Sequence, residues 1–151
     1  IKAIAGRDFT NPHKNLIENS GPLAWRVPQV KVDPSLNKWF VRFIVLQESR
    51  EVIGSSSFHG APDGDGMIEI GLGIEPAFQG KGYAKEASVA IIDYCFKTLK
   101  FSKITLGVID ENKNAVKLYE KLGFATESII ENSGVYDNKM CNSIRMVKRN
   151  D

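Results

Sequence analysis

The 151-residue sequence has no long hydrophobic run, little net charge, and only two cysteines and two histidines. No apolar segment approaches the roughly 18 residues that a membrane-spanning helix needs, so no membrane partner is expected. The net charge of +2 is too small to indicate nucleic-acid binding. Because the histidines and cysteines form no ligand cluster, no metal site is expected either.

The two cysteines, Cys95 and Cys141, both lie in apolar segments. This placement favours reduced, buried thiols over a disulfide scaffold, and it predicts a cytoplasmic protein. A thiol nucleophile at Cys95 is an alternative, but a buried structural cysteine is the favoured interpretation. The chain begins at Ile1 and not at methionine, which is expected of a fragment or a trimmed chain.

Apolar periodicity and turn residues predict an alternation of strands and helices. Expected are a short helix at 11–19, an irregular segment at 20–38, strands at 39–47, 51–58 and 67–75, a loop at 60–66, a helix at 82–99, a strand at 102–109, a helix at 112–122, and closing strands at 124–130 and 139–147. This order predicts a single α/β or α+β domain with a mixed, largely antiparallel sheet flanked by helices.

The segment Gln79-Gly80-Lys81-Gly82-Tyr83-Ala84 lies between a strand with two interior glycines and a long helix. Glycines let the backbone approach a ligand closely, and the first N–H groups of a helix attract anions. A dinucleotide fingerprint is disfavoured, because its third glycine position holds Lys85 and no acidic residue follows at the usual distance. A Walker loop is excluded, because no Gly-Lys-Ser/Thr occurs here.

Two motifs resemble the GNAT superfamily of N-acetyltransferases. The first is Gln79-x-x-Gly82-x-Ala84, and the second is Val108-x-x-x-Asn112-x-x-Ala115-x-x-Leu118-Tyr119-x-x-x-Gly123-Phe124. The strand Glu69-Ile70-Gly71 is similar to that of the Rim-type branch, whose namesakes acetylate the N-termini of ribosomal proteins. The resemblance covers about residues 39–147. Family members normally have one more N-terminal strand, which is absent here or lies in a trimmed part.

The resemblance implies acetyl-coenzyme A as cosubstrate. Backbone N–H groups of Gly80, Lys81, Gly82, Tyr83 and Ala84 would bind the pyrophosphate, and Gln79 would contact it through its amide. In this family the central strands splay apart to admit pantetheine. Backbone groups of Leu72, Gly73 and Ile74 would then bind it and polarise the thioester carbonyl. Asn112 would contact coenzyme A, although it is also a good helix N-cap.

Three side chains are candidates for catalysis. Tyr119, with a hydroxyl of pKa about 10, can donate a proton or a hydrogen bond to the leaving thiolate, whose thiol has a pKa of about 8.5. Glu69, on the glycine face of its strand, or His59, at a strand end, can accept the proton of the amine. Without a strong base the site suits an α-amine of pKa near 8 better than a lysine of pKa about 10.4.

The expected function is therefore acetyl transfer to a primary amine, of a protein N-terminus or a small molecule, by direct attack in a ternary complex. The alternative is a non-catalytic sensor that binds coenzyme A. Residues 39–147 would form the acetyltransferase core, residues 1–38 the acceptor side of the same domain, and residues 148–151 a tail. Loops at 59–66 and 131–139 should complete the acceptor site. A monomer or a homodimer is expected.

Overall fold

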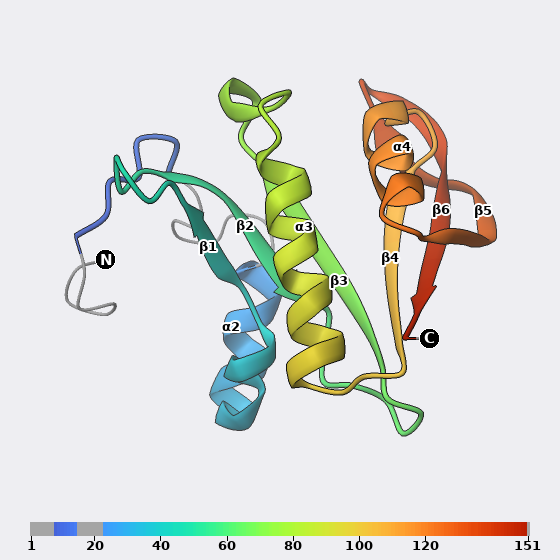
Figure 1. The fold of residues 1–151 in the computed structure, drawn as a ribbon, viewed down its shortest axis with the longest axis horizontal. Coiled ribbons are helices and arrows are strands. Elements are labelled where there is room, and N and C mark those ends of the chain that lie inside the picture. Colours follow the sequence, from blue (N-terminus) through green and yellow to red (C-terminus); the bar gives the residue numbers. More distant parts are fainter. Residues whose placement is uncertain (1–7, 15–22, 151) are drawn as a thin grey trace. The chain divides into compact units, whose positions relative to one another are not determined.

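The computed structural model describes residues 8–14 and 23–150. Within them, six strands are hydrogen-bonded in the order β1-β2-β3-β4-β6-β5 (Figure 1). The expected mixed, largely antiparallel sheet with helices is confirmed. The chain divides into two compact units: unit 1 takes residues 1–61 and 72–88, and unit 2 takes residues 62–71 and 89–151.

Unit 1 is built on an antiparallel hairpin. Strands β1 (Arg42–Val45) and β2 (Val52–Phe58) pair with Arg42 opposite Ser56. Arg50 in the connecting turn has a positive φ of 57°. The strand expected at 39–47 is thus shorter than predicted. Trp39 instead ends a 3-10 helix, and Phe40 caps it.

The irregular segment expected at 20–38 is the main error of the sequence prediction. Helix α2 spans Leu23–Val32 with Pro28 inside it, and the 3-10 helix η1 spans Pro34–Trp39. Leu23, Arg26 and Val30 are the half-buried residues of α2, at helical spacing. Pro34 stands at the start of η1, where its missing N–H costs nothing, so this proline is compatible with a helix.

Residues 11–14, the described part of the short helix expected at 11–19, form a turn. Lys14 N donates to Asn11 O at 3.1 Å, which closes a turn over residues 11–14. Residues 15–19 lie outside the described residues.

Strand β3 (Met67–Ile74) and helix α3 (Tyr83–Asp93) carry residues of both units. Between them lies the 3-10 turn η2 (Pro76–Phe78), and α3 continues into a π-helical turn, η3, at Tyr94–Thr98. In unit 1 the buried Gly54 of β2 lies directly against the backbone of Gly73 and Ile74. A Cβ on Gly54 would overlap the Gly73 carbonyl oxygen and lie 3.1 Å from Ile74 Cα.

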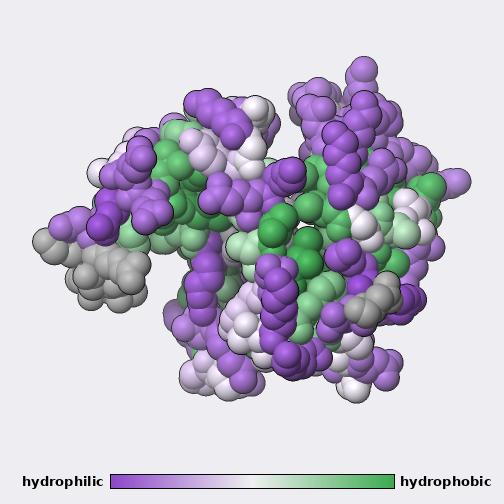
Figure 2. All heavy atoms as spheres, viewed as in Figure 1, coloured by the Kyte–Doolittle hydropathy of each residue, from purple (hydrophilic) through white to green (hydrophobic). Residues whose placement is uncertain are grey.

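The sheet of unit 2 has one parallel strand pair, and its other strand pairs are antiparallel. Strand β4 (Lys103–Ile109) runs parallel to the first residues of β3 and antiparallel to β6 (Lys139–Arg149), which pairs with β5 (Ala125–Tyr136). Helix α4 (Lys113–Lys121) packs on β4. The side chains in the core of this unit include Ile68, Ile92, Cys95, Ile104, Leu106 and Met146. The outer face of α4 is hydrophilic (Figure 2).

The two closing strands are longer than the predicted 124–130 and 139–147. β5 continues to Tyr136, and Asp137 and Asn138, both with positive φ, form a two-residue turn into β6. The Glu-Asn-Ser-Gly stretch at 131–134 resembles a loop in sequence but is an irregular part of the strand. Asn132 N donates to Asn142 Oδ1 there, and Ser143 N donates to Ser133 Oγ. The acceptor loop expected at 131–139 is therefore mostly strand.

Among the described helices, none combines the length and the apolar character needed to cross a membrane.

Candidate functional site

The predicted anion-binding loop of unit 1 has an open backbone. Gly80 and Gly82 have φ values of +74° and +90°, which side-chain-bearing residues rarely adopt. A Cβ on either glycine would meet no heavy atom within 4 Å beyond its chain neighbours. The glycines therefore supply both the conformation and the room for a ligand to approach the main chain.

The loop also offers unused donors. η2 uses the N–H groups of Phe78 and Gln79, which donate to Glu75 O and Pro76 O. Within the part of the chain that the structure describes, the N–H groups of residues 80–84 donate no backbone hydrogen bond. They precede or open α3, whose N-terminal dipole favours negative charge. This donor set fits a phosphate or pyrophosphate group.

Gln79 has a structural role that the sequence did not indicate. Its side-chain Nε2 donates to Ile74 O at 2.9 Å, so the amide ties the loop to the end of β3. Ile74 and its neighbour Leu72 are half-buried, whereas Gly73 is exposed. The predicted contacts of these residues with pantetheine stay predictions.

Asn112 and Tyr119 lie in unit 2. Asn112 Oδ1 accepts from Ala115 N at 3.2 Å, which makes it the N-cap of α4. Tyr119 is buried, and its ring packs edge-on against Phe124 with centroids 5.7 Å apart. Leu118 is only half-buried, so Tyr119 and not Leu118 is the core-facing residue of this pair.

The two candidate bases belong to different units. Glu69 is a half-buried residue of β3 in unit 2, opposite Thr105 of β4. His59 is exposed and directly follows β2 in unit 1. Unit 1 thus holds Leu72–Ile74, residues 79–84 and His59, while unit 2 holds Glu69, Asn112 and Tyr119.

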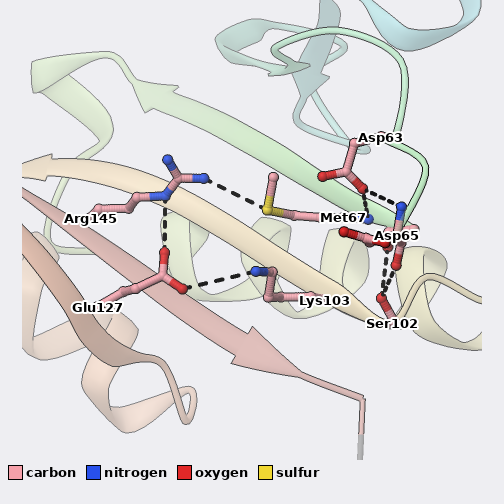
Figure 3. Close-up of polar contacts among 8 residues, drawn as sticks. Asp63, Asp65, Met67, Ser102, Lys103, Glu127 and Arg145 are labelled. Atoms are coloured by element: carbon pink, nitrogen blue, oxygen red, sulfur yellow. Dashed lines mark hydrogen bonds and ion pairs between the residues drawn. The ribbon is translucent and has the colours of Figure 1, made fainter.

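Sequence reasoning missed a charged cluster on the sheet face that Glu69 shares (Figure 3). Glu127 forms ion pairs with Arg145 at 3.2 Å and with Lys103 at 3.9 Å. Arg145 Nη2 also donates to Met67 Sδ at 3.7 Å. The cluster could not have been found without the strand register, because its members come from four separate segments.

The loop at 60–66 contains a turn that is held by side-chain hydrogen bonds. Asp63 Oδ1 accepts from the N–H groups of Asp65 and Met67, and Ser102 Oγ donates to Asp65 O at 2.6 Å (Figure 3). Among the described residues, no group of three or more histidine, cysteine, aspartate or glutamate side chains is placed to hold a metal ion.

Cys95 is fully buried in unit 2, and burial raises the pKa of its thiol from 9.0 to about 12. A thiol of this kind is a poor nucleophile, which favours the structural interpretation.

The pKa of the Cys95 thiol is higher in the folded state than in the unfolded state. Its contribution to the free energy of unfolding is therefore fully present below pH 9 and is lost as the pH rises from 9 to 12. We expect a loss of about 1.4 kcal/mol at pH 10 relative to pH 8. Urea unfolding at the two pH values, in the parent and in Cys95→Ala, would measure it. An equal pH dependence in both proteins would contradict the assignment.

Comparison with known proteins gives a family for most of the chain. Residues 14–125 match the Acetyltransferase (GNAT) domain family. The uncharacterized N-acetyltransferase YjdG of Bacillus subtilis is 37% identical over 81 residues, which are 54% of this chain and 48% of the relative. The spermidine N(1)-acetyltransferase of Escherichia coli K12 is 37% identical over 78 residues, 52% of this chain and 42% of the relative. The chain thus spans about half the length of these curated relatives.

Among solved structures, a dodecameric spermidine N-acetyltransferase from Vibrio cholerae has a TM-score of 0.70 and 26% identity. The match covers 82% of this chain and 70% of that one. The family match extends over well more than half of the sequence. The chain therefore belongs to the GNAT acetyltransferase family.

Proposed function

We propose that the protein is an acetyl-coenzyme A-dependent N-acetyltransferase that acts on a primary amine. The observation that carries the proposal is the loop at 79–84, where two glycines with positive φ leave unused backbone N–H groups at the start of α3. These donors suit the pyrophosphate of coenzyme A. The family match makes acetyl-coenzyme A the expected donor.

The bound cosubstrate would supply an acetyl group activated as a thioester. The acceptor nitrogen forms a bond to the carbonyl carbon, and the carbon–sulfur bond breaks. Tyr119 would hold the proton that the departing sulfur takes up. Glu69, or His59, would take the proton that the amine loses, directly or through water. Backbone groups of Leu72–Ile74 would hold the carbonyl oxygen.

The acceptor that we propose is an α-amine and not a polyamine. Residues 23–46 carry four cations, Arg26, Lys31, Lys38 and Arg42, against the single anion Asp33. Arg26 and Lys31 line a groove of about 190 Å³ between α2 and the Phe40 region. A polyamine would meet like charge there. An α-amine also agrees with the Rim-type resemblance and with its pKa near 8.

Release of free thiol from acetyl-coenzyme A tests the proposal. The acceptors to compare are peptides with a free α-amine, the same peptides with a blocked α-amine, spermidine, free amino acids and aminoglycosides. We expect turnover on at least one peptide with a free α-amine and none on its blocked form. Turnover on spermidine alone would reject the α-amine proposal. Coenzyme A binding without release on any amine would favour the sensor, and no binding would reject the donor.

A further inference from the structure

His13 contacts two other residues of unit 1, Glu51 and Phe78. Its Nε2 lies 3.2 Å from Glu51 Oε1, and both side chains are more than two-thirds buried, with exposures of 30% and 25%. Its ring also packs edge-on against Phe78, with centroids 5.6 Å apart and planes at 85°. A hydrogen bond on one side and an aromatic contact on the other fix the ring in one place.

Phe78 connects His13 to the anion-binding loop. It is the last residue of η2, directly before Gln79. Lys81 Nζ lies 5.1 Å from the centre of the Phe78 ring, and the ring of Tyr83 lies 6.4 Å from it. Lys81 is exposed, so little besides this ring restrains its ammonium group. The half-buried Phe78 is thus shared by one histidine outside the loop and two residues inside it.

The backbone around His13 is held as well. Thr10 N donates to Arg50 O at 3.0 Å, and Val52 N donates to Thr10 O at 2.8 Å. Thr10 and Glu51 form a parallel bridge. Glu51, which pairs with the His13 side chain, therefore also lies in the segment that holds the backbone near His13. The turn over residues 11–14 then brings the His13 ring to Phe78.

We infer that His13, held by Glu51, is a positioning residue for coenzyme A. It braces Phe78, and Phe78 in turn sets the placement of Lys81 and Tyr83 beside the N–H groups that would bind the pyrophosphate. The inference rests on the proposed function of this loop. It predicts that His13 affects the part of the cosubstrate that carries the phosphates and leaves the pantetheine part untouched.

The test compares binding of coenzyme A with binding of pantetheine, which has the same thiol arm but no pyrophosphate. Calorimetry would measure the Kd of both ligands for the parent, His13→Ala and Glu51→Gln. We expect the Kd of coenzyme A to rise about fivefold in His13→Ala, as loss of a restrained cation–π contact at an exposed site implies. The Kd of pantetheine should stay within twofold.

Further variants separate bracing from general stability. Lys14→Asn changes the neighbouring residue of the same turn, and asparagine tolerates its φ of 52°. It should bind both ligands like the parent. His13→Phe keeps an aromatic ring beside Phe78 and should recover part of the lost affinity. Phe78→Leu should weaken coenzyme A binding, and adding His13→Ala to it should weaken binding little further.

The outcomes are distinct. If the parent binds coenzyme A and His13→Ala binds it equally well, the bracing role is overturned and the proposed function stands. The same holds if His13→Ala lowers the Tm without changing the Kd, or if it weakens both ligands equally. A parent that does not bind coenzyme A would overturn the proposed function and the inference with it.

Discussion

Replacing Tyr119 with phenylalanine is expected to lower kcat about 100-fold, the typical size of one acid–base contribution. The variant removes only the hydroxyl, while the ring that packs against Phe124 stays in place. Loss of the proton donor slows departure of the thiolate and leaves cosubstrate binding alone. Steady-state thiol release would give kcat, and calorimetry would give a Kd for coenzyme A within about twofold of the parent.

Tyr94→Phe is the matched control, because Tyr94 is half-exposed in the π-helical turn and has no proposed role in catalysis. It should retain the kcat of the parent. If Tyr119→Phe also turns over at the parental rate, Tyr119 is not the acid. A fall in Tm with unchanged kcat would show that the hydroxyl serves only the core.

Gly54→Ala is expected to be the most destabilising single-methyl change in unit 1. The added Cβ would overlap the Gly73 carbonyl oxygen and lie 3.2 Å from the Gly73 carbonyl carbon, so backbone and not a flexible side chain must yield. We expect a loss of about 3 kcal/mol in the free energy of unfolding, the upper end of overpacking effects. In a chain of this size that lowers the Tm by about 6–12 °C.

Gly107→Ala provides the control for Gly54→Ala. Gly107 is also a strand glycine with φ outside the left-handed region, but its added Cβ would meet nothing within 4 Å. The Tm of this variant should stay within about 2 °C of the parent, because adding a methyl group to an uncrowded strand glycine changes the free energy of unfolding little. Equal Tm values for the two variants would show that β2 can move away from Gly73 without cost.

Much of the fold was predictable from local signals. The glycine-rich strand, the loop with two glycines and the capped helix α4 are set by residues close together in sequence, and their bounds agree with the structure to within one or two residues. Helix α2 was not predicted, and the two closing strands were predicted too short. Pro28 and the Glu131–Gly134 stretch are local breakers that tertiary hydrogen bonds and packing override.

The candidate site was predictable only as a set of residue types. The Asn112 cap and the open loop follow from the motifs. The roles that depend on long-range contacts do not. The bond from Gln79 to Ile74 O and the burial of Tyr119 need the three-dimensional structure. His13 pairs with a residue 38 positions away, and no pattern in the sequence connects it with Phe78.

The division of β3 and α3 between the two units limits how the protein can be taken apart. Each unit is assembled from two separate stretches of the chain, so neither can be produced as one continuous fragment. A truncation after residue 88 would keep the residues of unit 1 but leave residues 67–69 of β3 without β4, the strand with which they pair. Deletion mapping would therefore disrupt both units at once, and cofactor and acceptor functions have to be assigned by point substitution in the intact chain.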